Sequence, residues 1–408
     1  MSKNLLLLYI SVFITIVGFG MVFPLLPFYA QEFGATATGI GILAAAFPLG
    51  QIFVAPVVGK LSDRIGRKPV LFAALVGSAF SFFLFGVAQS FEMLVASRML
   101  HGAFTAGSFP IASAYIADST KEATRAKYMG RLTAMFALGI MVGPGVAGLL
   151  SIFGSSIPFF VAAIVSLFAS LFVYFFLPES LSLSARVHEK IRPRTFVSVF
   201  PRLIRGARGN MNVLFFSIFA WAFAISNFQV AFPLFTEASF GFTSTDIGVV
   251  FSFIGIVSAV AQFIVLPFLV ARYTEYKTAV AAALFMGIGQ VLIPYSSTWG
   301  MLVAFTGFSV FGGSMIRPLI NTILSEETQE GQGATMGIAF SFTSLGRIIG
   351  PVIAGALIAY INLASQFLVT GLILFSSALF LILRYNLFGI KRYIKSWEHL
   401  KDKQNPLG

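Results

Sequence analysis

Four basic side chains of this sequence lie inside long apolar runs. They are Arg98, His101, Arg317 and Arg347. A charge buried in an apolar membrane segment costs about 3 kcal/mol or more, so such a side chain faces the protein interior and has a function. A guanidinium can make paired hydrogen bonds to a carboxylate or phosphate, and an imidazole titrates near neutral pH. These residue types therefore indicate anion binding and proton transfer.

No acid accompanies these cations. The fifteen acidic residues lie in polar loops or at the ends of apolar runs. A negatively charged substrate would supply the charge that Arg317 and Arg347 lack, which predicts a cargo that includes an organic anion or zwitterion. Alternatively, both side chains extend toward the lipid headgroups. For Arg98 the alternative is hydrogen bonding to backbone carbonyls, and for His101 it is a neutral, hydrogen-bonded imidazole.

The elements that must position these side chains are membrane-spanning helices. The chain has 408 residues, 57% of them hydrophobic and only 10% charged, whereas a soluble domain has about 25% charged residues. Because backbone groups in lipid must be paired within their own segment, each run of about 20 apolar residues is expected to be a helix. The runs lie near 5–30, 38–59, 70–89, 92–116, 128–152, 156–177, 210–236, 245–271, 278–296, 299–324, 334–360 and 363–384. A β-barrel is excluded because short alternating segments are not seen.

Charge predicts the orientation of these twelve helices. The Lys and Arg residues of the loops fall on one side, and the opposite loops near 31–37, 153–157 and 237–244 contain none. By the positive-inside rule, both termini and the long linker are expected in the cytoplasm. The net charge of +12 therefore indicates cytoplasmic loops and contact with anionic headgroups rather than nucleic-acid binding.

The two halves of the chain repeat. The Gly-Pro pairs Gly143-Pro144 and Gly350-Pro351 recur at an offset of 207, and Pro110 corresponds to Pro318 at 208. The repeat predicts an all-α membrane protein of twelve transmembrane helices in two pseudo-symmetric six-helix bundles, with the substrate path between them. The expected division is a first bundle, a cytoplasmic linker, a second bundle and a cytoplasmic tail, at 1–177, 178–209, 210–384 and 385–408. Apolar residues at helical spacing in the linker and the tail predict basic amphipathic helices that lie on the lipid surface.

Several function classes find no support in the residues. Cysteine is absent and the three histidines are far apart, so no metal site is expected. The chain carries no nucleophile–base constellation and no phosphate-binding G-x-x-x-x-G-K-[ST] loop, so we expect neither an enzyme nor a nucleotide-driven pump, and no cofactor.

The loop from Gly59 to Pro69, G-K-L-S-D-R-I-G-R-K-P, resembles the signature loop of the major facilitator superfamily. The run Gly139 to Gly148 resembles the fifth-helix motif of its drug–proton antiporter branch, and Thr15 to Pro27 resembles the first helix of tetracycline-type exporters. Two departures matter. Thr15 stands where those exporters have an aspartate, and His101 replaces a common glutamine beside Arg98.

The resemblance implies roles for particular residues. Asp63, Arg67 and Asp118 are expected to form a cytoplasmic gate, together with Gly59 and with Asp63 capping the helix that starts near Gly333. A second group is expected to form a bendable seam between the bundles, with plain tight packing as the alternative. It consists of Gly143, Pro144 and Gly148. Arg98 and His101 are candidates for proton coupling.

Polar residues in apolar helices are candidates for substrate binding beside Arg317 and Arg347. They are Gln51, Asn227, Gln229 and Gln262. The resemblance implies a monomeric transporter in the cytoplasmic membrane of a prokaryote. The function it implies is proton-coupled antiport that exports a drug-like or metabolite molecule, and the buried cations favour an organic anion as cargo. The alternative is uptake or facilitated transport of a small organic anion without proton antiport.

Overall fold

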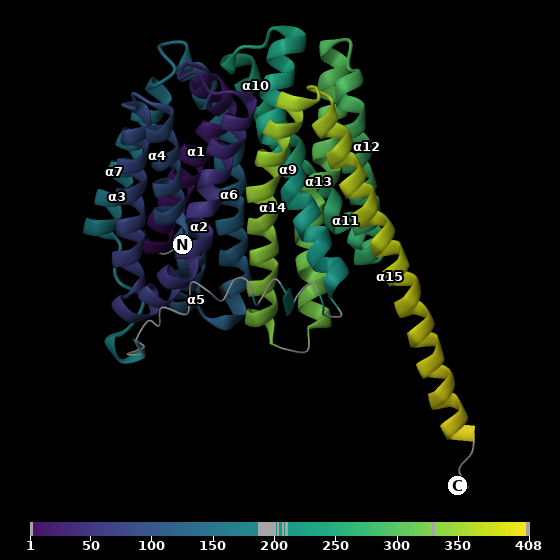
Figure 1. Cartoon of the computed structure of the whole chain (residues 1–408). Helices are drawn as coiled ribbons and strands as arrows, with labels where there is room; N and C mark the ends of the chain where they lie inside the picture. The colour runs from purple at the N-terminus through teal and green to yellow at the C-terminus, as the bar shows by residue number, and fades with distance from the viewer. Residues whose placement is uncertain are drawn as a thin grey trace.

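The computed structural model describes residues 3–186, 201, 204–205, 208, 211–328 and 331–404. Within these residues every element is helical (Figure 1). The first half contains α1 (Lys3–Gln31), α2 (Ala37–Ile65), α3 (Arg67–Gly86), α4 (Phe91–Thr105), α5 (Ser108–Ser119), α6 (Glu122–Ser151), α7 (Ile157–Phe176) and the short η1 (Leu183–Ala185). The second half contains α9 (Asn212–Phe240), α10 (Ser244–Val260), η3 (Ala261–Val265), α11 (Leu266–Arg272), α12 (Glu275–Leu292), η4 (Ile293–Tyr295), α13 (Trp299–Glu327), α14 (Gln332–Tyr360) and α15 (Ser365–Gln404).

Eleven helical segments of the described residues are long and apolar enough to cross a membrane. One of them runs through α10, η3 and α11 with a π-helical turn at Ala261–Val265. The remaining crossing is made by α4 and α5 together, so the predicted single helix near 92–116 is broken. Pro110 has no N–H for the Ala106 carbonyl, and the Thr105 hydroxyl donates back to the His101 carbonyl at 2.6 Å. Both features weaken the helix at this point, although neither suffices alone, since α13 continues through the equivalent Pro318.

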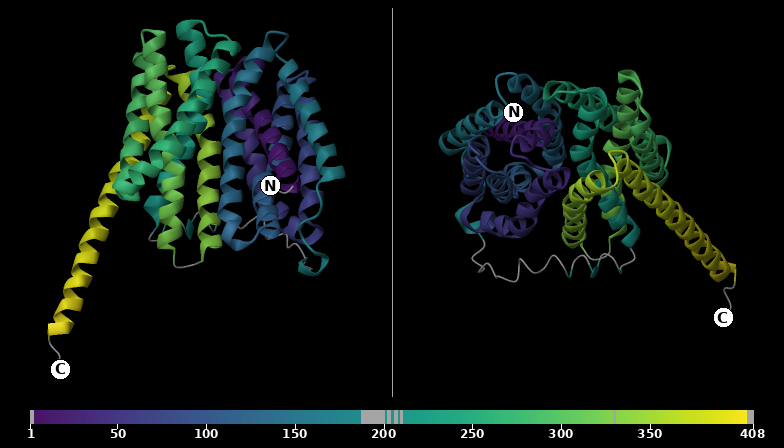
Figure 2. Two further views of the ribbon diagram at one scale, coloured as in Figure 1. Left: turned by 180° about the vertical axis from the view of Figure 1, so that it is seen from behind. Right: turned by 45° about the horizontal axis from the view of Figure 1, so that its top comes forward.

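The helices form two bundles side by side, α1–α7 and α9–α15 (Figures 1 and 2). The bundles repeat their internal packing through glycines. In α6, Gly139 and Gly143 lie against α1, and a Cβ on Gly143 would stand 2.6 Å from the Val17 carbonyl oxygen. In α14, Gly346 and Gly350 lie against α9 in the same way. The sequence repeat is therefore a repeat of close helix contacts.

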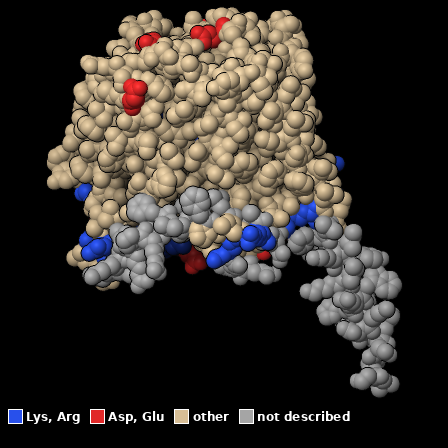
Figure 3. Space-filling view, in the orientation of Figure 1, with Lys and Arg blue, Asp and Glu red and all other residues tan. Residues whose placement is uncertain are grey.

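Charge distinguishes the two ends of the molecule. Lys and Arg side chains gather toward one end together with a few acidic side chains, and in this view the opposite end shows acidic side chains alone (Figure 3). We call the first the basic end; it includes Lys60, Arg64 and Lys68, where α2 meets α3. We call the other the far end; it includes Glu32 and Glu237, where α1 and α9 finish.

Two parts of the chain bear on the predicted surface helices. The amphipathic helix predicted in the linker covers Val197 to Ile204, and most of these residues lie outside the described part of the chain. The last helix, α15, is a single helix of 40 residues that continues well beyond the bundle (Figure 1). The side chains of 390–403 lie outside the described part, so their contact with lipid stays a prediction.

Candidate transport site and gates

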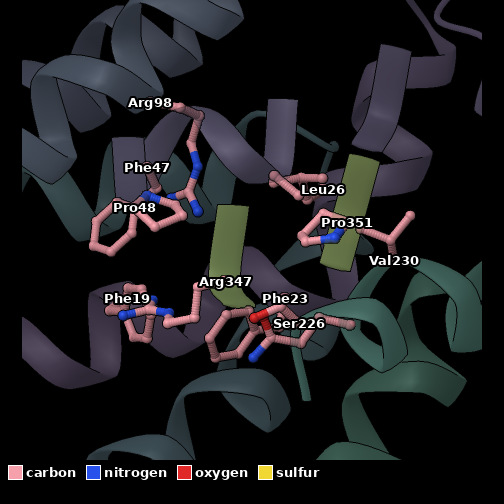
Figure 4. Close-up of a pocket in the computed structure, with 12 residues that line it drawn as sticks. Phe19, Phe23, Leu26, Phe47, Pro48, Arg98, Ser226, Val230, Arg347 and Pro351 are labelled. Atoms are coloured by element: carbon pink, nitrogen blue, oxygen red, sulfur yellow. The ribbon is translucent and has the colours of Figure 1, made fainter. Parts of the chain in front are cut away.

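A pocket lies between the two bundles at mid-depth (Figure 4). Its walls come from α1, α2 and α4 on one side and α9 and α14 on the other. The lining residues are Phe19, Phe23, Leu26, Ala44, Phe47, Pro48, Arg98, Ser226, Gln229, Val230, Arg347 and Pro351. Its free volume is about 20 Å³, which holds a water molecule, whereas ligand pockets span about 300–1,000 Å³. The bundles must therefore move apart before a substrate fits.

Two arginines from different bundles point into this pocket (Figure 4). Arg98 of α4 is only 4% exposed, and its guanidinium carbon lies 4.8 Å from the centre of the Phe47 ring. Arg347 of α14 donates from Nη1 to Oε1 of Gln51 at 3.3 Å, and it lies 5.7 Å from the same ring. Within the described residues, Nε and Nη1 of Arg98 have no hydrogen-bond partner. The alternative of backbone-bonded nitrogens is therefore not seen for these two atoms.

The charges that act on these arginines are themselves positive. Arg98 is repelled by Arg347, and Arg347 is repelled by Arg317. Arg317 does not line the pocket. Its side chain is exposed, and its guanidinium carbon lies 5.6 Å from the centre of the Trp221 ring. The indole N–H of Trp221 donates to the Gly313 carbonyl at 2.8 Å. Three cations thus share one region without a paired acid among the described residues.

His101 lies one turn along α4 from Arg98. It is 2% exposed, and its ring packs 4.3 Å from the Phe82 ring and 5.2 Å from the Phe47 ring. Neither imidazole nitrogen has a partner among the described residues. The predicted alternative, a hydrogen-bonded histidine, is therefore not what this structure shows.

The predicted polar residues divide into two groups. Gln229 lines the pocket, and Gln51 holds Arg347 at its edge. Asn227 does not line it and is fully buried, with both amide atoms unpaired among the described residues. Gln262 lies on the π-helical turn and donates to Ser258 at 3.4 Å. The structure thus joins Arg98, Arg347, Gln51 and Gln229 but leaves the other two apart.

The seam between the bundles is formed by two helix crossings toward the far end. In α6, Pro144 and Gly148 lie against α10: a Cβ on Gly248 would meet the Pro144 carbonyl oxygen at 2.6 Å. In α14, a Cβ on Gly355 would meet the Ala37 carbonyl oxygen of α2. Gly143 instead packs inside its own bundle against α1.

Hydrogen bonds reinforce this closure at the far end. Gln31 Nε2 donates to Glu237 at 3.1 Å, Ser151 and Ser244 hydroxyls lie 2.9 Å apart, and the Thr245 hydroxyl donates to the Gly148 carbonyl at 3.0 Å. At the basic end, a Cβ added to Gly59 of α2 or to Gly333 of α14 would have no atom within 4 Å. The bundles therefore touch at the far end and stand apart at these positions of the basic end.

At the basic end, Arg67 forms ion pairs with two acids of the first bundle. Its Nε donates to Asp118 at 3.1 Å and its Nη1 to Asp63 at 2.5 Å. Asp63 does not cap α14, whose first residues have no side-chain cap. The predicted latch belongs to a state closed at the basic end, and this structure is closed at the other. That prediction therefore stays a prediction.

The chain matches the family model described as the Major Facilitator Superfamily over residues 8–265 and 214–397. It belongs to the major facilitator superfamily. Multidrug resistance protein 2 of Bacillus subtilis (strain 168) is 30% identical over 375 residues, covering 91% of this chain and 93% of that protein. Quinolone resistance protein NorA of Staphylococcus aureus (strain COL) is 28% identical over 362 residues, covering 88% and 90%.

Among solved structures, the human organic anion transporter MFSD10 (TETRAN) superposes with a TM-score of 0.70 at 23% identity, covering 93% of this chain and 98% of that one. This likeness concerns the fold. The predicted twelve-helix, two-bundle architecture of a major facilitator transporter is confirmed, with α4 and α5 sharing one crossing. The chain is a multi-pass membrane protein of a family of transporters.

Sequence reasoning missed several residues of this major facilitator protein. Glu179 accepts from the backbone N–H groups of Arg67 and Lys68 at 2.9 and 3.1 Å and so caps α3. In the second bundle, Tyr276 donates to Glu327 at 2.5 Å, and Arg384 donates to both. Tyr276 and Arg384 are 108 residues apart, and no local pattern signals their contact.

Proposed function

We propose that this protein is a secondary active transporter that exports a small amphipathic organic anion. The observation that carries the proposal is the pairing of Arg98 and Arg347 across one pocket with no paired acid among the described residues. Aromatic rings of Phe19, Phe23 and Phe47 complete the pocket, so the cargo combines a negative group with an apolar frame. The names of the bacterial relatives, which concern drug resistance, support export.

Transport proceeds by alternating access, in which the bundles rock about the pocket. Pro144 and Gly148 allow the close crossing at the far end, with Gly143 supporting the same helix from inside its bundle. Asp63, Arg67, Asp118 and Gly59 form the gate at the basic end. When that gate closes, Asp63 turns from Arg67 toward the N-terminus of α14, where the helix dipole favours an anion.

The proposed orientation places the basic end in the cytoplasm, with both termini on that side. The protein works as a monomer, and its basic end contacts anionic headgroups. Protons are the proposed coupling ion, and Arg98 with His101 is the proposed coupling pair. Arg347, Arg317, Gln51 and Gln229 are the proposed substrate contacts; Asn227 and Gln262 are kept as candidates that a wider pocket would expose.

A second candidate is uptake or facilitated transport of the same class of anion without proton antiport. One observation favours it. Thr15 is buried and hydrogen-bonded to its own helix, and no acid lies against Arg98 or His101 among the described residues. Nothing there would compensate a proton on the imidazole. A small anion also leaves a cell along the inside-negative potential without an exchanged proton, which favours facilitated export over uptake.

The test uses the full chain in proteoliposomes, with the membrane potential clamped and a pH gradient imposed. The probes are 2-naphthalenesulfonate, whose charge does not change with pH, and the matched cation 2-naphthylmethylammonium. We expect flux of the sulfonate against its gradient when protons flow the other way. If sulfonate flux is the same with and without the pH gradient, the second candidate is supported. Flux of the cation alone overturns the anion proposal.

Arg347→Gln is expected to abolish sulfonate flux because it removes a cation of the pocket. Arg272→Gln is the matched control, since Arg272 is exposed at the end of α11 and far from the pocket lining. Flux that survives Arg347→Gln and falls in Arg272→Gln would show that surface charge, rather than the pocket, attracts the anion.

A further inference from the structure

The Phe47 ring joins the two arginines of the pocket. The Arg98 guanidinium carbon lies 4.8 Å from its centre, and the Arg347 guanidinium carbon lies 5.7 Å from it. The two guanidiniums are therefore no farther apart than the sum of these distances. They come from different bundles, and both point into the pocket in Figure 4. One molecule of modest size can reach both.

The charge of this pair is unbalanced. Arg98 is 4% exposed and has two nitrogens without a partner among the described residues. Arg347 donates to the neutral side chain of Gln51. An aromatic ring face attracts a cation by about 0.5–2 kcal/mol, which is much less than a carboxylate provides. The ring thus holds the pair together without neutralising it.

A singly charged substrate would leave one of these two cations uncompensated in the pocket. We infer that the substrate carries two negative charges on an aromatic or otherwise apolar frame, so that each guanidinium receives one of them. This inference rests on the proposed function and narrows its substrate class. It makes Arg98 a specificity-determining residue, in addition to any part it takes in proton coupling.

The rest of the pocket fits such a molecule. Phe19 and Phe23 from α1 and Val230 from α9 offer apolar walls, and Ser226 and Gln229 offer neutral hydrogen-bonding groups. An acid within the pocket would repel the second negative charge, and the lining contains none. Arg317, exposed beside the pocket over Trp221, extends the positive potential along the path toward the basic end.

The test compares two probes that share one ring system and have permanent charges: 2-naphthalenesulfonate and 2,6-naphthalenedisulfonate. Their equilibrium binding is measured with the purified full chain in lipid nanodiscs. We expect the disulfonate to bind at least about tenfold more tightly than the monosulfonate, since each charge-assisted contact to a buried guanidinium is worth that much. In Arg98→Gln the preference should vanish, because the second sulfonate then has no guanidinium to contact.

Arg272→Gln, which removes an exposed cation outside the pocket, should keep the full preference. Arg98→Lys keeps the charge and should keep the order of the two probes, so it tests the inference if Arg98→Gln does not fold. Equal binding of both sulfonates by the unmodified protein would overturn the two-charge inference and leave anion transport standing. Failure of both to bind, with binding of 2-naphthylmethylammonium, would instead overturn the proposed function itself.

Discussion

The fourth crossing of the first bundle, formed by α4 and α5, corresponds in the repeat to α13 of the second bundle. The two occupy equivalent positions in the repeat but carry different kinds of polar side chain. At the offset of 208 that relates Pro110 to Pro318, Arg98 corresponds to Thr306 and His101 to Ser309. In α13, Ser309 accepts from the Gln290 amide at 3.2 Å and donates to the Met286 carbonyl at 3.3 Å. In α4, the imidazole of His101 instead packs at a tilt against the Phe82 ring. One bundle holds a neutral polar cluster where the other holds two ionisable groups.

The glycines behave in the opposite way. Gly139 and Gly143 face α1 as Gly346 and Gly350 face α9, and Gly148 meets α10 as Gly355 meets α2. Close approach of backbones is therefore duplicated, whereas charge is not. The difference indicates that the repeated parts provide the motion and that the unrepeated side chains select what is carried. The basic end supports this division, because its two clusters use Arg67 on α3 in one bundle and Arg384 on α15 in the other.

The largest effect is expected from giving α4 the residue of its counterpart, Arg98→Thr. Loss of a charge-assisted contact costs about 1.5–3 kcal/mol, so transport of 2,6-naphthalenedisulfonate should fall by about 10–100-fold. Initial flux into proteoliposomes measures it. Thr306→Ser, a matched change at the neutral position, should stay near the level of the unmodified protein. Similar losses in both variants would mean that the two positions do not differ in function.

His101→Ser makes the second exchange between the bundles. If His101 carries the coupled proton, accumulation driven by a pH gradient should fall about tenfold, which is less than the roughly 100-fold or more that loss of a general acid–base group costs an enzyme. Exchange of labelled for unlabelled sulfonate across the membrane, which needs no net proton movement, should persist. Accumulation equal to that of the unmodified protein would remove His101 from coupling and favour transport without proton antiport.

The duplicated glycines give a prediction for both crossings. Gly148→Ala and Gly355→Ala each add a methyl group at a crossing of the far end, where overpacking costs about 1–3 kcal/mol. Each should open the far end more often and slow transport by about fivefold or more. The larger effect is expected from Gly355→Ala, because its Cβ would lie 2.3 Å from the Ala37 carbonyl oxygen, whereas that of Gly148 would lie 3.1 Å from the Thr245 carbonyl oxygen. Labelling of an engineered cysteine at the far end reports the opening. Gly130→Ala, where no atom lies nearby, is the control. An effect of one variant alone would mean that only one crossing holds the far end closed.

The sequence predicted the spans, the repeat and the family because each depends on local composition. Hydropathy marks a helix in lipid whatever its neighbours are, and glycine spacing marks close packing. The break at Thr105 to Ser108 was missed, because Pro110 alone does not indicate one: the equivalent Pro318 lies inside the unbroken α13.

The site was predicted only in part. Arg98, Arg347 and Gln229 were found because a polar group in an apolar helix is conspicuous. Phe19 and Phe47 were missed, since 48 phenylalanines give no sign of which face lipid. Arg317 was predicted to bind substrate but lies outside the pocket lining. The prediction missed this because the rotation of α13 about its axis cannot be inferred from an almost uniformly apolar sequence. Contacts between distant segments, such as Tyr276 with Arg384, have no signature in one sequence.

The smallest effect is expected at the basic end, from Asp63→Asn. In this structure Asp63 is one of two acids bonded to Arg67, so the Asp118 contact should keep the first bundle intact and leave expression unchanged. Turnover should still fall about threefold, because an amide lacks the negative charge that the helix dipole favours at the N-terminus of α14 in the state closed at this end. Steady-state flux per purified molecule measures turnover. Glu327→Gln, in the second bundle's cluster, is the comparison: if the two bundles use this end differently, it should lower stability more than turnover. If Asp63→Asn leaves turnover unchanged, the acid serves only Arg67, and the gate at this end must be formed by other residues.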